Sequence, residues 1–123
     1  MSEERMADEV SRKIELAWLT AFYGGLLTDK QRQVLTLHCE EDLSLGEIAQ
    51  EAGVSRQGVH DMLTRAAQRL FDMEEKLGMA ARFQRMEDGL ERCRTLLKEK
   101  RYDEAEGVID TLIRLDQEEN NGL

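Results

Sequence analysis

The residues of this 123-residue chain best suited to binding chemistry gather in one short window. Guanidinium, imidazole, amide, carboxylate and hydroxyl groups recur there about every three or four residues, which places them along one side of an α-helix. Such groups hydrogen-bond to the edges of nucleic-acid bases, and arginines also bind phosphates. We therefore take the window as a candidate surface for nucleic-acid or partner binding. Its residues are Ser55, Arg56, Gln57, His60, Asp61, Thr64, Arg65 and Arg69.

Two predicted helices and a tight turn position this surface. Ser44, with Glu47 three residues later, forms a capping box that starts the first helix. Gly53 can take the left-handed conformation that ends it, Val54 fills the gap between the helices, and Ser55 caps the second helix. This order predicts a helix-turn-helix motif. The inward residues are Leu45, Ile48, Ala49 and Ala52 in the first helix, and Val59, Leu63, Ala66 and Leu70 in the second.

Two more helices are predicted before the motif. One runs from about Asp8 to Tyr23, and Gly24 and Gly25 end it. The other opens with a second capping box, Thr28 with Gln31. It continues to His38, which we expect to be a hydrogen-bonded core residue. The residues expected to be buried in the first of these helices are Val10, Ile14, Ala17, Trp18, Ala21 and Phe22.

Past the motif, apolar residues alternate steps of four and three as far as Gly78, and the pattern resumes from Met79. A last helix is opened by Asp103 with Glu106. With no proline and few aromatic residues, we expect an all-α fold. Residues 1–78 form a helix-turn-helix domain with an N-terminal helix, and residues 79–123 a C-terminal helical hairpin. The apolar seam after the motif can be covered by this hairpin or by a second copy, and we expect a homodimer in which both contribute.

The charge balance bears on the ligand. The chain has a formal net charge of −9, and Thr28 to Lys76 holds six basic against ten acidic residues. DNA-binding domains usually carry a basic face, because phosphate contacts supply much of their affinity. Here only the second helix of the motif is locally positive, and Asp61 would repel phosphate unless it pairs with Arg65. A weak nucleic-acid contact or a protein partner fits this balance.

Other classes of function find no support in the sequence. Cys39 and Cys93 lack metal-site spacing, and His38 and His60 complete no ligand set. There is no glycine-rich phosphate loop and no nucleophile with a suitably spaced histidine and carboxylate. The acidic start is unlike a secretory signal, and the run from Leu16 to Leu27 is too short to span a bilayer. We expect a cytoplasmic protein that is not an enzyme, needs no cofactor or metal and does not insert into membranes.

Three segments resemble one family of small bacterial proteins, the YlxM family, itself similar to the promoter-reading region 4 of sigma factors. The segments are LLTDKQR (Leu26 to Arg32), EDLSLGEIAQE (Glu41 to Glu51) and VSRQGVHD (Val54 to Asp61). The resemblance covers roughly Phe22 to Leu77.

The resemblance implies a link to the signal recognition particle pathway, because members of this family are encoded beside the particle's GTPase and its receptor. We therefore expect a sigma-region-4-like helix-turn-helix protein that modulates this pathway by binding the GTPase, the particle's RNA or both. The alternative is a transcriptional regulator that binds duplex DNA through Arg56, Gln57, His60, Asp61 and Thr64.

Overall fold

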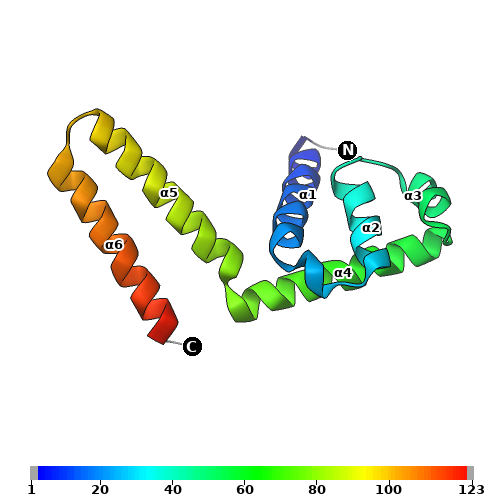
Figure 1. Ribbon diagram of the computed structural model, residues 1–123. Helices are drawn as coiled ribbons and strands as arrows, with labels where there is room; N and C mark the ends of the chain where they lie inside the picture. The colour runs from blue at the N-terminus through cyan, green and yellow to red at the C-terminus, as the bar shows by residue number, and fades with distance from the viewer. Residues whose placement is uncertain (1–2, 122–123) are drawn as a thin grey trace. The chain divides into compact units, whose positions relative to one another are not determined.

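The computed structural model describes residues 3–121, and at Arg5 and residues 119–121 it describes the backbone alone. This part of the chain is helical throughout its regular elements, as predicted (Figure 1). The contacts divide it into two compact units, one ending at Ala80 and the other beginning at Ala81. The elements are α1 (Glu3–Tyr23), the 3₁₀ turn η1 (Gly24–Leu26), α2 (Asp29–Cys39), α3 (Leu45–Ala52), α4 (Arg56–Leu77), α5 (Met79–Lys98) and α6 (Tyr102–Asn121).

In the first unit, α1 and α2 lie side by side and both pack on α4, while α3 packs on α2 and α4 (Figure 1). Two hydrophobic clusters result, and Leu63 of α4 borders both. Each large side chain buried in them contributes about 1.5–3 kcal/mol of transfer free energy. The buried residues of the larger cluster are Leu16, Leu19, Tyr23, Leu27, Leu35, Ala66, Ala67, Leu70 and Ala80. Those of the smaller one are Val34, Ile48, Ala52 and Val59.

The buried side of α1 differs from the prediction. Val10 and Ile14 are 57% and 65% exposed, whereas Leu16, Leu19 and Tyr23 lie in the core. Apolar residues surround much of this helix, and α2 and α4 cover only one side of it, so periodicity alone could not select the side. The predicted burial was therefore wrong for three residues, Val10, Ile14 and Ala21, while Ala17, Trp18 and Phe22 are half-buried.

The end of α1 is fixed to the junction of α4 and α5 by Tyr23. Its hydroxyl donates to Glu74 Oε1 at 2.7 Å and accepts from the backbone N–H of Met79 at 3.1 Å. Glu74 Oε1 also accepts from the Ala80 N–H at 3.0 Å. Burial, and next the hydrogen bond to Glu74, raise the pKa of Tyr23. Gly78, with φ of 63°, supplies the left-handed residue that ends α4 at this junction.

The apolar seam of α4 is covered within this unit. Ala66 and Leu70 are fully buried against the other helices, and Met73 is half-buried. Leu77, at the end of the helix, is 48% exposed. A second copy is therefore not needed to shield this seam from water.

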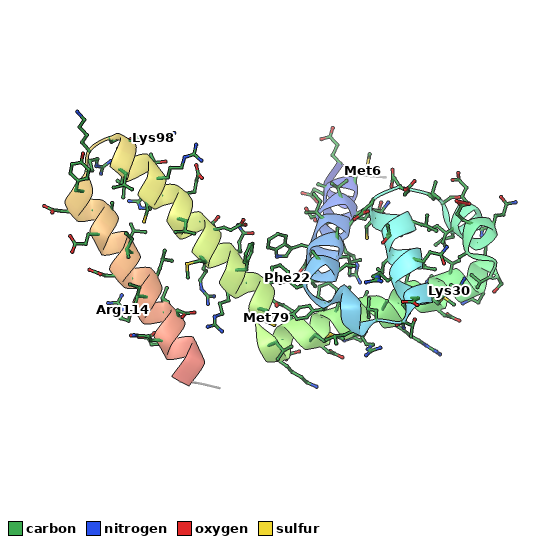
Figure 2. The ribbon with its side chains drawn as sticks, in the orientation of Figure 1. Met6, Phe22, Lys30, Met79, Lys98 and Arg114 are labelled. Atoms are coloured by element: carbon green, nitrogen blue, oxygen red, sulfur yellow. The ribbon has the colours of Figure 1, made fainter. Side chains whose placement is uncertain are left out.

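The second unit is an antiparallel hairpin of α5 and α6, in which Lys98 and Arg114 mark the two helices (Figure 2). Cys93, Leu96 and Ala105 are buried between the helices. Gly89 lies against the side chain of Leu112, so closely that an added Cβ would be 2.6 Å from its methyl carbons. The absence of a side chain at Gly89 thus permits the close approach of the helices.

The hairpin turn departs from the prediction at one point. The helix α6 begins at Tyr102, so Asp103 lies inside its first turn and is not the capping residue. The turn is instead held by Arg101, whose guanidinium binds the carboxylates of Glu99 and Glu104. Lys100 takes a left-handed conformation there, with φ of 60°.

His38 of α2 is half-buried, and its Nδ1 is buried without a hydrogen-bond partner among the described residues. The prediction of a hydrogen-bonded core residue was therefore wrong. Burial, and next the positive charge of Lys13, lower the pKa of His38, while Asp42 opposes them. Lys13 and Asp42 form an ion pair that joins α1 to the loop before α3.

None of the described helices is long and apolar enough to cross a bilayer.

The contact at Gly89 can be tested against a matched glycine. Gly89→Ala forces a methyl group against Leu112, and we expect this overpacking to destabilise the hairpin by about 1–3 kcal/mol. Gly107→Ala meets no atom within 4 Å and gains about 0.5–1 kcal/mol in helix propensity. Amide hydrogen exchange in α6 measures both effects. Equal exchange rates in the two variants would show that the close approach is unimportant.

A second pair of glycine variants tests the hydrogen bond that caps α4. Gly46 and Gly58 occupy the first turns of α3 and α4, and alanine should stabilise either helix by up to about 1 kcal/mol. A Cβ at Gly58 would lie 3.1 Å from Ser55 Oγ, against 4.0 Å from Ser44 Oγ at Gly46. We expect both variants to raise the melting temperature, Gly58→Ala by less. A fall with Gly58→Ala would show that the Ser55 cap cannot move aside.

The lowered pKa of His38 predicts that the stability of the fold depends on pH. Because folding lowers the pKa of this imidazole, the unfolded chain, whose histidines titrate near about pH 6.5, takes up a proton more readily. The stability that neutral His38 contributes is fully present above about pH 6.5, and it is lost as the pH falls through the lower pKa of the folded state. We expect the melting temperature to fall between pH 7.5 and 5.5, and to fall less in His38→Phe. An equal fall in both proteins would rule out this role.

Candidate nucleic-acid interface

The local hydrogen bonds of the helix-turn-helix are those that the sequence predicts. Ser44 Oγ accepts from the N–H of Glu47 at 3.2 Å, and the Glu47 carboxylate accepts from the N–H of Ser44 at 3.1 Å. Gly53 has φ of 70°, in the left-handed region. Ser55 Oγ accepts from the N–H of Gly58 at 2.9 Å. These bonds satisfy backbone groups that the helix ends leave unpaired, and they fix the angle at which α4 leaves the turn.

One contact of the motif was missed from the sequence. Lys30 Nζ of α2 donates to the carbonyl oxygen of Ala52, at the last residue of α3, at 2.7 Å. A cation at a helix C-terminus interacts favourably with the unpaired carbonyls there. The contact joins residues 22 positions apart, so no local pattern could reveal it.

The structure places all of the predicted site residues at the start and on the exposed side of α4. Ser55 acts mainly as the helix cap, so its hydroxyl is already engaged. The seven others, from Arg56 to Arg69, are exposed, whereas Val59, Ala66 and Leu70 of the same helix are buried. Hereafter we call the seven the recognition surface. They are Arg56, Gln57, His60, Asp61, Thr64, Arg65 and Arg69.

Asp61 is held by a neighbour other than the one we expected. Its carboxylate accepts from the side-chain amide of Gln57 at 3.1 Å, and His60 Nδ1 lies 3.7 Å away. Among the ion pairs of the described residues, none joins Asp61 to Arg65. The negative charge of Asp61 therefore stays uncompensated by arginine, and a nucleic-acid ligand must approach so that its phosphates avoid this residue.

The arginines of the recognition surface, unlike Asp61, have no hydrogen-bond or ion-pair partner for their side chains among the described residues. They are Arg56, Arg65 and Arg69, and all three are exposed. Arg65 and Arg69 lie one helical turn apart. An exposed guanidinium without a carboxylate partner can bind a phosphate without first breaking an ion pair. These three residues are the part of the surface best suited to an anionic ligand.

The exposed side of α4 includes one residue that the prediction left out, between Arg65 and Arg69. Gln68 is exposed and donates through its side-chain amide to Asp72 at 2.9 Å. The spacing of Gln57, Asp61, Thr64 and Gln68, in steps of four, three and four, is the signal that could have included it. No group of three or more His, Cys, Asp or Glu residues in the described chain could hold a metal ion.

Comparison with known proteins agrees with the motif. The family model described as "Putative helix-turn-helix protein, YlxM / p13 like" matches residues 10–109. The chain is 36% identical over 109 residues to a UPF0122 protein of Bacillus cereus strain AH187, covering 87% of this chain and 99% of the relative. A UPF0122 protein of Bacillus anthracis strain A0248 matches equally well.

A UPF0122 protein of Desulforamulus reducens is 52% identical over 65 residues, which are 53% of this chain and 56% of that relative. The match to the family model includes α2, the helix-turn-helix and all of α5, so it extends well past the recognition surface. The chain belongs to the YlxM and p13-like family of helix-turn-helix proteins.

Proposed function

We propose that this protein is a non-enzymatic regulator that acts in the cytoplasm by binding nucleic acid through the recognition surface. The observation that carries the proposal is the set of three exposed arginines, Arg56, Arg65 and Arg69, on a helix whose opposite side is buried at Val59, Ala66 and Leu70. A rigid helix presents its unpaired guanidinium groups from fixed backbone positions, so the backbone does not have to rearrange when they bind phosphates.

We propose further that the regulated system is the signal recognition particle pathway, as the resemblance to the YlxM family implies. The particle's RNA is then the first ligand to test. Single-stranded loops and helix ends of RNA expose base edges that Gln57 and His60 can reach. With a net charge of −9, the protein should bind weakly and with a strong dependence on salt.

A protein partner is the second candidate, and the outer side of α1 favours it. Val10, Ile14, Ala17 and Trp18 line an open groove of about 540 Å³ there. An apolar groove of this kind is typical of a docking site for a helix. The particle's GTPase is the partner that the family resemblance implies.

The three ligands can be compared in one experiment. Fluorescence anisotropy would follow binding of the labelled protein to the particle's RNA, to its GTPase and to an unrelated duplex DNA at several salt concentrations. Tighter binding to the RNA than to the DNA supports the proposal. Tighter binding to the DNA would instead favour the transcriptional regulator, and binding to the GTPase alone would move the function to the groove on α1.

Substitutions in the recognition surface test the site itself. We expect Arg56→Ala and Arg65→Ala each to weaken nucleic-acid binding and to lower the salt slope by about one unit, since each removes one phosphate contact. Arg94→Ala on α5 is the control, because it removes an exposed arginine from the other unit. Unchanged affinity and slope in both surface variants would place the binding site elsewhere.

A further inference from the structure

The hairpin of α5 and α6 has large hydrophobic side chains on its surface. Cys93, Leu96 and Ala105 are the buried residues of this unit among those described. Five other apolar or aromatic side chains of the same two helices are between 41% and 60% exposed. A contiguous set of this kind usually marks a surface that another molecule covers. The five are Leu90, Leu97, Tyr102, Ile109 and Ile113, hereafter the hairpin patch.

The residues of the hairpin patch lie on one side of the hairpin. Leu90 directly follows Gly89, and Ile113 directly follows Leu112, and Gly89 and Leu112 lie against each other between the helices. One residue is a turn of about 100° around a helix axis. Because the helices run in opposite directions, this turn carries Leu90 and Ile113 to the same side. The other three residues are four or seven positions from these two along their own helices, so they share that side.

The opposite side of the hairpin is polar. An open groove of about 540 Å³ crosses both helices there. Its lining includes the residues that directly precede those at the contact between the helices, as a turn in the other direction requires. The hairpin therefore has one apolar and one polar side. The groove residues at these preceding positions are Arg85, Asp88, Arg92, Glu104, Gly107 and Thr111.

The apolar side is large enough for a stable interface. Each helix has 20 residues, which is about 30 Å of length, and two helices side by side are about 20 Å wide. Covering this side would bury roughly 600 Å² of the hairpin and, with its partner, about 1,200 Å² in total, the lower end of the range for specific protein–protein interfaces. Helical units as small as this hairpin commonly gain the stability that their own core lacks by oligomerisation.

The charges of the two helices favour a second copy as the partner. The helix α5 has five basic and three acidic residues, whereas α6 has one basic and seven acidic residues. A two-fold axis parallel to the helices lays α5 of one copy on α6 of the other, so that helices of opposite charge are neighbours. An axis across the helices would lay α6 on α6 and bring the two acidic helices together. The chain thus carries the electrostatic complement of its own hairpin.

The levels of the patch residues fit the first of these arrangements. Cys93 Sγ donates to the carbonyl oxygen of Ala105 at 3.6 Å, so these two residues lie level in the hairpin. Leu97 is four residues after Cys93, and Tyr102 is three residues before Ala105, which places both about 4–6 Å nearer the turn. An axis parallel to the helices preserves these levels. Leu97 of one copy therefore faces Tyr102 of the second copy.

We propose that the hairpin patch binds a second copy of this chain and that the two hairpins form a four-helix bundle. In this bundle α5 of each copy lies on α6 of the other, and both hairpin turns are at the same end. Leu97 packs on Tyr102 of the second copy near the turns, and Leu90 packs on Ile109 of the second copy further along. The inference concerns the hairpin and does not depend on the proposed nucleic-acid ligand.

The oligomeric state of the full chain tests the surface. Light scattering across a dilution series from micromolar to near-millimolar protein should give a mass that rises toward twice the 14.2 kDa of one chain. Ile109→Glu places a carboxylate in the apolar interface, and we expect it to keep the mass at the single-chain value. Thr111→Glu adds the same charge to the same helix on the polar side, and it should assemble as wild type.

Three results of this series would overturn the proposal. They are a single-chain mass of the wild-type protein at every concentration, dimers that survive Ile109→Glu, and an equal loss of dimers in both variants. Ile109 is 41% exposed in the single chain, so a glutamate there leaves the monomer folded. Melting curves of the two variants check this point.

A mixing experiment tests the pairing of α5 with α6. Leu97→Glu and Tyr102→Lys each place two unpaired charges in the interface, and we expect each variant alone to self-associate about tenfold more weakly or worse. In a mixed dimer Glu and Lys meet at one contact, while the other contact keeps its native Leu97 and Tyr102. Native mass spectrometry of an equal mixture should therefore show mainly the mixed dimer. A mixed fraction no larger than random pairing gives would overturn the alternating arrangement of α5 and α6.

Discussion

The burial of one side of α4 is the constraint on which the first unit depends. Val59, Ala66 and Leu70 have no exposed surface, and they touch residues from the three preceding helices. Removing a large buried side chain from such a position costs about 2–5 kcal/mol, so rotation of α4 about its axis is not accessible. The same constraint fixes the opposite side of the helix. The recognition surface is therefore a rigid array whose geometry is set by the core beneath it.

The electrostatics of the surface limit what such an array can bind. Three arginines are unpaired among the described residues, while the Asp61 carboxylate accepts from the Gln57 amide and lies 3.7 Å from His60 Nδ1. An exposed arginine can add a phosphate contact, whereas the Asp61 carboxylate and the overall charge of −9 oppose the approach of a polyanion. An acidic protein with a small basic surface binds nucleic acid selectively only where geometry lets phosphates meet the arginines and avoid the carboxylate. Regulation by weak, salt-sensitive contacts suits that arrangement.

The two units hold together by different means. The first has two hydrophobic clusters and a hydrogen-bonded tyrosine, Tyr23, at the end of α1. In the hairpin, Cys93, Leu96 and Ala105 are the buried residues among those described, and the helices approach closely because Gly89 leaves room for Leu112. The ion pair of Arg82 with Asp116 is half-buried and joins α5 to α6.

Local chemistry is what the sequence by itself determined. The caps at Thr28, Ser44 and Ser55, the left-handed Gly53 and the exposure of the recognition surface were all predicted, because each depends on hydrogen bonds or periodicity within a few residues. Asp103 was misjudged because Arg101 holds the turn through its side chain, which a capping pattern does not reveal.

Only the tertiary structure decided which side of α1 is buried, where the hydroxyl of Tyr23 is bonded and that His38 keeps an unpaired nitrogen. These features join residues far apart in the chain. A helix with apolar residues on two sides can bury either one, and the choice belongs to the helices that pack on it.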